Sequence, residues 1–411
     1  MNEYLKILII VFILLIFIEF LLFFTVNTIK KDFQWIITNK DEFPIKSLDE
    51  LNKFYQKNYN FLTGWDKKKN SQSIELLDNK KTFYKINAKG FRNTKFSHKK
   101  SIISVFGDSY AFCRYVNDKD TWECKLEDKI QSCVRNYGVG NFGLDQSYIK
   151  FKSIKLPKST KLIIFAFVPE TISRVNSYWK HYSEFGNKFG FKPIYKLENN
   201  KLILNKNLLV KNKNLNFIKK IIPILKKKDI FYERRFKKYI FKFPYIFSYL
   251  KFLNRNNTIF FNIILFKFFK ILNLKNKNRY YKSSYNKIIK ENILDANRMY
   301  NEFEFKTHLF KMITMINTNV NKNKKQCLFV IIPQLYDLHN MIQNKNNYSN
   351  FFNEINKLYK INFLDLTNIM INKKKIEKFY LEDRYGGHLS IKGNKFVANE
   401  IYKYLNKNKI I

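Results

Sequence analysis

The stretch Ser101-Ile-Ile-Ser-Val-Phe106-Gly107-Asp108-Ser109-Tyr110 decides how this chain folds. Residues 101–106 form a short apolar run, which is typical of a buried parallel strand. The serine that follows this run lies where open α/β sheets bind their ligands, at the carboxyl end of a strand. A serine hydroxyl needs a neighbouring base, most often a histidine, before it can act as a nucleophile. Ser109 is therefore the first candidate for a reactive side chain.

The rest of the chain repeats this alternation of strand and helix. Helices are expected over residues 121–132 and over residues 393–405, where apolar side chains recur on one face. Four further apolar runs read as strands: residues 133–137, 161–168, 327–332 and 361–366. Strands separated by helices predict an α/β protein with a parallel sheet and helices on both of its faces.

One of the histidines has the surroundings of a catalytic base. The chain contains five: His98, His181, His308, His339 and His388. Only His388 lies in a loop with neighbouring glycines, Asp383-Arg-Tyr-Gly-Gly-His388, ahead of the last predicted helix. The two glycines allow backbone conformations that bulky residues cannot adopt. His388 is therefore the candidate base and Asp383 the candidate acid, whereas His181 reads as a packed residue, with substrate contact as the alternative.

The four cysteines argue against a disulfide-rich scaffold in a chain of 411 residues. They form no C-x-x-C pair, which argues against a structural zinc site. No metal or cofactor is expected. Cys113, Cys124 and Cys133 are close in sequence, so a disulfide among them and buried free thiols are both open.

The chain has a large excess of basic residues, which either an anionic partner or a bias in amino-acid composition could explain. Lys and Arg number 76 against 33 for Asp and Glu, which gives a formal net charge of +43. Biased codon usage accounts for part of this excess. The segment from Lys211 to Lys282 nevertheless holds 20 basic residues and two acids, which favours contact with an anionic membrane or polysaccharide. Nucleic acid is not expected, because no zinc-finger or RNP-type motif is present.

The N-terminal region predicts a membrane anchor. Residues 7–26 are almost entirely apolar apart from Glu19, and twenty residues of helix span about 30 Å, the thickness of a bilayer core. A cleaved signal peptide would have a shorter apolar core and a small-x-small cleavage site, and neither is found. We therefore expect an anchor over residues 1–29, then a stalk and entry segment over residues 30–81.

Residues 82–411 form the main predicted domain, with a long basic insertion at about residues 175–325. Within the insertion, residues 258–274 are strongly apolar but contain Lys267 and Lys270. This segment is too short and too charged for a membrane span and suits an interfacial or buried amphipathic helix.

Four motifs resemble those of the SGNH/GDSL hydrolases, and more closely the membrane-anchored bacterial members. The resemblance covers residues 87–168 and 327–405. In chain order the motifs are Asn87-Ala-Lys-Gly-Phe-Arg92, Phe106-Gly-Asp-Ser109, Asn136-Tyr-Gly-Val-Gly140-Asn141-Phe-Gly-Leu-Asp-Gln146 and His388-Leu-Ser-Ile-Lys-Gly393-Asn-Lys-Phe-Val-Ala398. The resemblance implies a flavodoxin-like three-layer sandwich with a parallel sheet. It also implies a nucleophile at Ser109, a base at His388, an acid at Asp383 and no cofactor.

The resemblance further implies how the negative charge of an acyl intermediate is held. Backbone N–H groups of Ser109 and of the Gly140–Asn141 turn would donate to the oxyanion, while Asp108 would fix the turn around the serine. The family's usual Gly-x-Asn is missing here, and Arg174 stands in its place as a candidate for neutralising the charge. Asp383 precedes His388 by five residues, where family members place the acid two or three before it. Either the loop is wider, or the site works as a Ser–His dyad.

Three functions follow as expectations. The resemblance implies an esterase that removes O-acetyl or similar acyl groups from carbohydrates through a Ser-His-Asp acyl-enzyme. An O-acyltransferase of surface glycans would use the same intermediate with a sugar hydroxyl as acceptor. A catalytically silent module would bind anionic membrane or polysaccharide through its basic insertion. The expected location is the bacterial inner membrane, with a single span and the domain on the periplasmic side.

Overall fold

The computed structural model describes residues 3–78, 80–210, 214–274, 277–343, 347–383 and 385–410. Its centre is a parallel sheet of five strands in the order β13-β12-β8-β6-β7. The bounds of these strands are β6 Ser101–Gly107, β7 Cys133–Asn136, β8 Leu162–Phe167, β12 Gln326–Ile331 and β13 Phe363–Asp365. The five predicted strands are thus confirmed, with their ends shifted by one or two residues.

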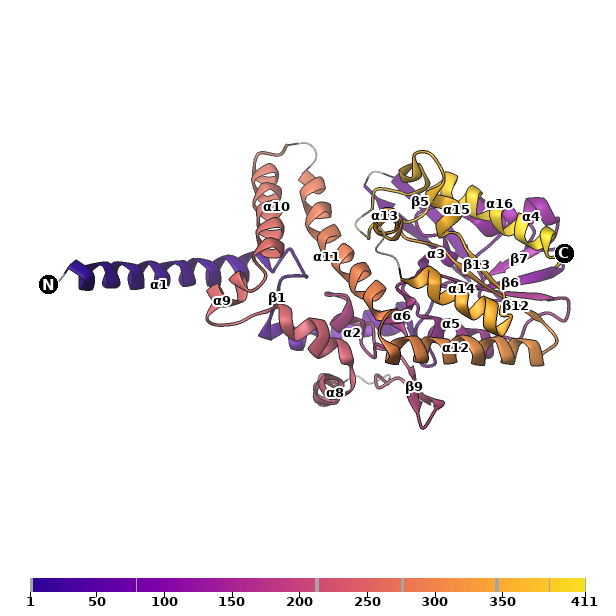
Figure 1. Ribbon diagram of the computed structural model, residues 1–411, viewed down its shortest axis with the longest axis horizontal. Coiled ribbons are helices and arrows are strands. Elements are labelled where there is room, and N and C mark those ends of the chain that lie inside the picture. Colours follow the sequence, from indigo (N-terminus) through magenta and orange to yellow (C-terminus); the bar gives the residue numbers. More distant parts are fainter. Residues whose placement is uncertain are drawn as a thin grey trace.

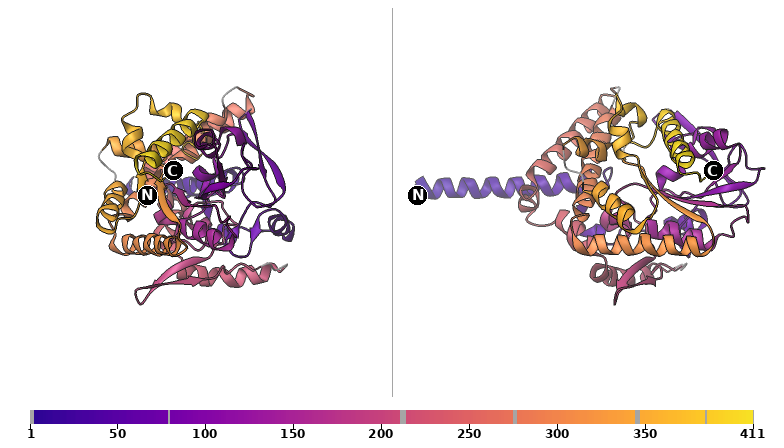
Figure 2. Two further views of the ribbon diagram at one scale, coloured as in Figure 1. Left: turned by 90° about the vertical axis from the view of Figure 1, so that its right-hand side faces the viewer. Right: turned by 45° about the vertical axis from the view of Figure 1, so that its right-hand side comes forward.

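Helices cover both faces of the sheet (Figures 1 and 2). On one face lie α4 (Trp122–Ile130) and α16 (Ile391–Lys407), which pack on strand residues such as Val105 and Ile164. On the other face lie α5 (Leu144–Ser153), α12 (Phe303–Lys322) and α14 (Tyr348–Tyr359), against Phe165 and Phe329. The strands alternate their side chains between these two cores because successive residues of a strand point to opposite faces.

The strand order places the end of β6 at the point where the chain reverses direction across the sheet. The first strand of the sheet, β6, has the second and third strands, β7 and β8, on its two sides. In such doubly wound sheets the ligand binds outside the carboxyl ends of the strands at this point. Helix α3 (Ser109–Phe112) begins there.

The segment between β8 and β12 differs in part from the predicted insertion. Its elements are α6 (Thr171–Arg174), α7 (Lys180–Ser183), β9 (Ile194–Glu198), β10 (Lys201–Asn205), α8 (Leu215–Lys228), β11 (Ile240–Phe241), α9 (Tyr245–Leu250), α10 (Leu253–Ile271) and α11 (Lys277–Met299). The predicted insertion also included residues 303–322, but these form α12, which packs on β12. Two parallel neighbouring strands need a crossover helix, and α12 supplies it. Residues 211–213 and 275–276 of the basic segment lie outside the described residues.

The N-terminal region is packed more closely than a stalk. Helix α1 (Glu3–Ile29) projects from the body, and it is the one helix in the described residues that is long and apolar enough to cross a membrane. Membrane anchors and signal sequences share this property. After α1, buried side chains such as Phe33, Ile36 and Leu51 join the main core, so this part of residues 30–81 is not an extended stalk. The other elements before β6 are β1 (Ile37–Thr38), α2 (Leu48–Lys57), β2 (Tyr59–Asn60), β3 (Gly64–Trp65), β4 (Ser71–Leu77) and β5 (Lys80–Ile86).

Candidate active site

Ser109 is held at the start of α3 by the residue before it. The Asp108 carboxylate caps this short helix, because one of its oxygens accepts a hydrogen bond from the Tyr110 backbone N–H at 2.8 Å. Its other oxygen accepts from the Val168 N–H at 3.0 Å and from the Arg174 guanidinium at 3.1 Å. Asp108 therefore ties the turn around Ser109 to the end of β8.

Gly107 allows the turn to approach its neighbouring strand. A Cβ atom at this position would lie 1.8 Å from the Ala166 carbonyl oxygen and 2.7 Å from the Ala111 Cβ. We expect Gly107→Ala to lower the free energy of unfolding by about 3 kcal/mol, because the backbone of β6 or β8 must move. Thermal unfolding in detergent measures the loss. Gly140→Ala is the matched control, since a Cβ at Gly140 would meet nothing within 4 Å; equal unfolding of the two variants would contradict the prediction.

His388 and Asp383 come together because the loop between them folds around the carboxylate. One carboxylate oxygen accepts from the backbone N–H groups of Tyr385 at 2.7 Å and Gly387 at 3.1 Å, and the other accepts from the His388 N–H at 2.9 Å. Gly386 and Gly387 have φ angles of +86° and +97°, a region that residues with a Cβ rarely adopt. These two conformations turn the chain back on itself, so a spacing of five residues still places acid and base side by side.

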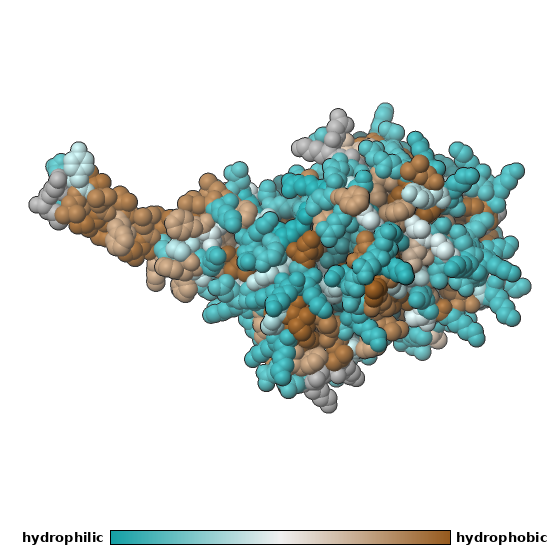
Figure 3. Space-filling model, turned by 60° about the horizontal axis from the view of Figure 1, so that its bottom comes forward, coloured by the Kyte–Doolittle hydropathy of each residue, from teal (hydrophilic) through white to brown (hydrophobic). Residues whose placement is uncertain are grey.

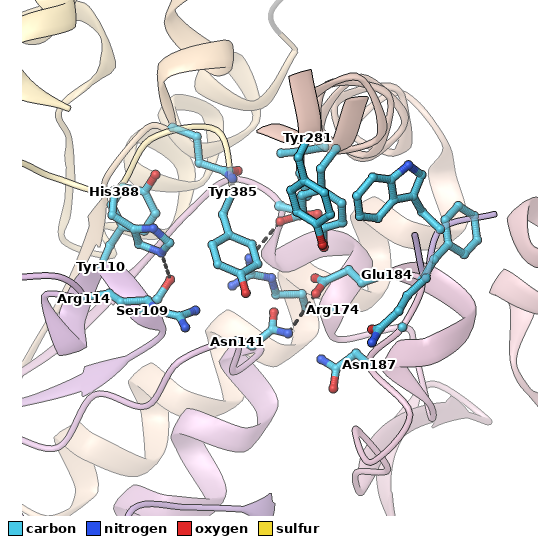
Figure 4. A pocket seen from close by; sticks show the side chains of 18 residues that line it. Ser109, Tyr110, Arg114, Asn141, Arg174, Glu184, Asn187, Tyr281, Tyr385 and His388 are labelled. Atoms are coloured by element: carbon cyan, nitrogen blue, oxygen red, sulfur yellow. Dashed lines mark hydrogen bonds and ion pairs between the residues drawn. The ribbon is translucent and has the colours of Figure 1, made fainter. Parts of the chain in front are cut away.

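The three predicted catalytic side chains form one hydrogen-bonded row, of which Figure 4 shows Ser109 and His388. The Ser109 Oγ lies 2.9 Å from the His388 Nε2, and the His388 Nδ1 lies 2.5 Å from the Asp383 Oδ2. All three residues are buried, with 7 % or less of their surface exposed. The sequence blocks that supply them are separated by about 280 positions, and the fold joins them at the end of the sheet.

The electrostatics of this row favour one tautomer of the histidine. Burial alone would raise the pKa of Asp383, but the charge of His388 and the hydrogen bonds from its ring and from the loop N–H groups lower that pKa to about 2. Asp383 is thus a carboxylate at neutral pH and accepts the Nδ1–H of the imidazole. The Nε2 is then left as an acceptor for the hydroxyl of Ser109.

Three tyrosines surround the imidazole. The ring centroids of Tyr110, Tyr115 and Tyr385 lie 5.2, 5.6 and 5.9 Å from that of His388. The Tyr110 hydroxyl donates to the Gly387 carbonyl oxygen at 2.6 Å, which ties α3 to the histidine loop. The imidazole is therefore fixed by packing as well as by its two hydrogen bonds.

The row opens into a cavity of about 310 Å³ (Figure 4). Ser109 and His388 form part of its wall, and the remaining wall comes from distant parts of the chain. The segment after α1 gives Gln34 and Trp35, and α11 gives Tyr281, Tyr285 and Ile289. The other lining residues are Tyr110, Arg114, Asn141, Glu170, Arg174, Glu184, Phe185, Gly186, Asn187, Gln334 and Tyr385.

The structure brings Asn141 and Arg174, two of the predicted oxyanion or positioning residues, to the cavity wall. Asn141 has a φ of +68° and donates through its Nδ2 to the Glu184 carboxylate at 2.8 Å. Gly140 is not among the residues that line the cavity, and its carbonyl oxygen accepts from the Trp65 indole N–H at 3.0 Å. This bond fixes the turn from which the Asn141 backbone N–H projects.

Arg174 has carboxylates on two sides. Its guanidinium donates to Asp108 at 3.1 Å, to Glu170 at 2.8 Å and to the Phe142 carbonyl oxygen at 3.3 Å. Burial by itself lowers the pKa of Arg174, but the two carboxylates raise it above the usual value. Because its charge is already paired, this arrangement favours positioning of the Asp108 turn over neutralisation of an oxyanion.

Asn176 does not replace the missing asparagine of the Gly-x-Asn motif. Its amide donates to the Ile172 carbonyl oxygen at 2.8 Å, and its side-chain oxygen lies 2.8 Å from the ring of the buried His308. Neither residue lines the cavity. Both belong to the packing of the insertion against the core.

Several lining residues were not found from the sequence. Glu184 accepts a hydrogen bond from the buried Lys180 at 2.7 Å. Burial raises the pKa of the Glu184 carboxyl, but the charges of Lys180 and Arg174 outweigh burial and hold this pKa below its usual value. Tyr385 lies inside the loop that contains Asp383, so its place could have been inferred. Trp35 and Tyr281 reach the cavity only through the packing of segments that no motif connects.

His181 is buried and serves the fold instead of the cavity. Its Nε2 donates to the Asp41 carbonyl oxygen at 2.8 Å, and its Nδ1 accepts from the Gly186 N–H at 3.3 Å. Only the neutral ring satisfies both partners. The pKa of His181 is lowered from 6.5 to about 4, and burial of the ring is the main cause of this shift.

The buried His181 predicts a pH dependence of stability. An unfolded chain takes up a proton at this side chain below about pH 6.5, whereas the folded one does so only near pH 4, so stability is lost as the pH falls between these values. The loss should reach about 3 kcal/mol at pH 4. Chemical unfolding in detergent between pH 7 and pH 4 measures it. His181→Gln should flatten this dependence and the exposed His98→Gln should not; equal slopes would contradict the prediction.

All four cysteines are free and buried, so the alternative of a disulfide among Cys113, Cys124 and Cys133 is not observed. The Cys113 thiol lies 3.1 Å from the Glu123 carboxylate. Burial raises the pKa of that carboxyl to about 8, so it is a neutral acid at pH 7 and the contact carries no charge. This contact joins the end of α3 to the start of α4.

Comparison with known proteins gives a few distant matches. No protein-family model and no curated protein matches the chain. Among solved structures, it is similar to a candidate lipolytic protein of the G-D-S-L family from Desulfitobacterium hafniense DCB-2, with 10% sequence identity and a TM-score of 0.34. This alignment covers 73% of the present chain and 97% of the other. A second crystal structure aligns with 11% identity and a TM-score of 0.33, over 75% of this chain and 97% of that one.

Proposed function

We propose that this protein is a membrane-anchored serine hydrolase of the SGNH/GDSL type, which cleaves ester bonds of acylated carbohydrates. The observation that carries the proposal is the row Ser109–His388–Asp383, with contacts of 2.9 and 2.5 Å at the wall of a cavity. The SGNH-type sandwich is proposed on the same grounds, together with the strand order and the four sequence motifs.

The geometry supports acyl transfer through a covalent intermediate. As the Ser109 Oγ attacks the ester carbonyl, its proton passes to the Nε2 of His388, and Asp383 stabilises the resulting imidazolium. His388 then gives the proton to the leaving alcohol, and an acyl-enzyme on Ser109 remains. Water that attacks this ester restores Ser109 and releases a carboxylic acid. A sugar hydroxyl in place of water would give the O-acyltransferase alternative.

The negative charge that develops on the carbonyl oxygen needs donors on the side opposite the histidine. We assign this role to the backbone N–H groups of Ser109 and of the Gly140–Asn141 turn. The turn is fixed by the Trp65 bond to Gly140 and by the Asn141 bond to Glu184. Donors that are already oriented stabilise such a charge without further reorganisation, typically by about 3–4 kcal/mol each.

The cavity wall supports a carbohydrate substrate. The lining includes the aromatic residues Trp35, Tyr281 and Tyr285 and the polar residues Gln34 and Asn187. Sites of this kind hold a ligand's apolar surface against rings and orient it through a few polar contacts. A sugar ring offers C–H faces and hydroxyls that match both. The small volume suits a single acylated unit at the reacting end of a longer chain.

The contacts of α1 support an anchor over a cleaved signal sequence. Val26 and Ile29, in its last turn, are buried in the main core. Its Glu19 carboxylate accepts hydrogen bonds from the backbone N–H groups of Tyr245 and Ile246. Removal of α1 would leave these partners uncovered. We place the domain on the periplasmic side of the bacterial inner membrane, as the resemblance to membrane-anchored members implies.

Labelling with a fluorophosphonate probe tests the proposal directly. The probe reacts with a serine hydroxyl that a histidine has activated, so the full-length protein in detergent should carry one label on the peptide that contains Ser109. Protein unfolded before labelling is the control and should not react. If the folded protein also fails to react, the serine is not activated and the silent binding module becomes the better explanation.

A further inference from the structure

An apolar surface remains uncovered on α9 and α10, inside the basic insertion. On α10, Phe261, Ile264, Phe268 and Ile271 are each more than half exposed. Their spacing of three, four and three residues places them on one face of the helix. The opposite face buries Ile259 and other apolar side chains, and α10 packs along α11. Phe247 and Leu250 on α9, and Phe243 just before it, are also more than half exposed.

Direct contacts hold α9 beside the middle of α1. The start of α9 is bonded to Glu19, at 2.5 and 2.9 Å from its two carboxylate oxygens. Glu19 lies ten residues before Ile29 at the end of α1, a distance of about 15 Å along a helix. The Tyr245 ring also packs edge-on against Phe23 at 5.5 Å. The start of α9 therefore lies beside the apolar part of α1, well short of its end.

Helix α10 lies near the C-terminal end of α1. Its Lys267 forms an ion pair of 2.6 Å with Asp32, three residues after α1 ends. Its Phe266 packs edge-on against Phe33 at 5.5 Å. In Figure 1, α10 runs across the direction of α1 and has α11 on the side of the main body. Its uncovered face is thus turned toward the side from which α1 extends.

The charges around this surface match an anionic leaflet. Lys242, Lys251 and Lys270 are exposed on α10 and on the segments that flank α9. Lys31, just after α1, is exposed as well. The apolar surface of α1 continues into apolar side chains at its base, and polar side chains border them (Figure 3). An apolar face bordered by lysines is the pattern of helices that lie in the membrane interface.

We propose that α9 and α10 form a second membrane-binding element: α9 enters the bilayer beside α1, and α10 lies in the interface with its uncovered face in lipid. The inference rests on the part of the proposed function that makes α1 an anchor, and it does not depend on catalysis.

One consequence of this arrangement concerns the cavity. Phe266 of α10 packs on Tyr281 at 5.7 Å, and Tyr281, a cavity residue, packs on Trp35 at 5.0 Å. The cavity wall is therefore in contact, through the Tyr281 and Phe266 rings, with the helix that we place in the interface.

Fluorescence quenching in a bilayer tests this arrangement with the full chain. Four single variants, Phe247→Cys, Phe268→Cys, Leu14→Cys and Leu358→Cys, are labelled with an environment-sensitive dye. They are reconstituted in vesicles of phosphatidylcholine and phosphatidylglycerol that carry a quencher at a shallow or a deep position of the acyl chain. Leu358 on α14 is 74% exposed and serves as the matched aqueous control, and Leu14 reports on α1. The four native cysteines are buried, so unmodified protein gives the blank.

Dyes at positions 247 and 268 should lose most of their fluorescence, and the dye at position 358 almost none. The shallow quencher should act more strongly at position 268, and the deep quencher more strongly at position 247. Quenching at position 14 without quenching at 247 and 268 would overturn the inference and leave the anchor intact. A dye at position 14 that is not quenched would remove the anchor and the inference with it. Failure of fluorophosphonate labelling alone would affect neither.

Discussion

Replacing Ser109 with alanine is expected to reduce kcat for p-nitrophenyl acetate by at least about 10⁴-fold. The reason is chemical: without the Oγ no acyl-enzyme forms, and the base at 2.9 Å has no hydroxyl to activate. The remaining donors and the cavity would still bind substrate, so KM should change far less than kcat. Steady-state kinetics with full-length protein in detergent measures both constants.

Ser104→Ala is the matched control for this experiment. Ser104 lies on β6, five residues before Ser109, and it is also buried, but its hydroxyl has no hydrogen-bond partner among the residues that the structure describes. Its removal should leave both activity and stability close to those of the unmodified protein. If Ser109→Ala kept its activity while it remained folded, the nucleophile would be another group and the proposed mechanism would be wrong.

The central sheet could be predicted from the sequence because each of its strands is a compact apolar run. Both faces of a parallel sheet are covered, so a strand such as Leu162–Phe167 is apolar throughout, and its signal is local. Ser109 followed from the same pattern, since it comes just after a predicted strand. His388 followed from its glycine-flanked loop ahead of the last predicted helix. What could not be predicted is how far the crossover extends into the insertion, because α12 resembles the other helices of the insertion in composition.

The walls of the cavity were beyond prediction for a different reason. Trp35 follows the apolar helix and Tyr281 lies in the most basic segment. In the sequence, neither residue is near a motif that indicates a site. They reach the cavity because the end of α1 packs against α10 and α11 through the Phe33 and Phe266 rings. Contacts between residues separated by more than 200 positions leave no periodic signal in a single sequence. The basic residues of the insertion likewise give no indication of the exposed apolar face of α10 beside them.

Asp383→Asn should lower kcat by about 10⁴-fold at neutral pH while the protein stays folded. One oxygen of Asp383 accepts two backbone N–H groups, from Tyr385 and Gly387, and the asparagine oxygen is needed there. The amide NH₂ group then replaces the oxygen that accepted from the His388 N–H and from the ring, so the backbone bond is lost and the amide donates to the Nδ1. This moves the ring proton to Nε2, where it opposes the Ser109 hydroxyl and removes the base. Kinetics and near-ultraviolet circular dichroism measure activity and fold.

Asp337→Asn supplies a control of the same chemistry in an equally buried place. Burial raises the pKa of Asp337 to about 8, so the side chain is already neutral at pH 7, and an amide replaces it with little change in charge. It caps α13 (Leu335–Ile342) through the Gln334 N–H at 2.8 Å, and it is not among the residues that line the cavity. Activity within tenfold of the unmodified protein for both variants would show that Asp383 only shapes the loop. The site would then be a Ser–His dyad, in which the glycine pair and the backbone N–H groups orient the base without help from the charge.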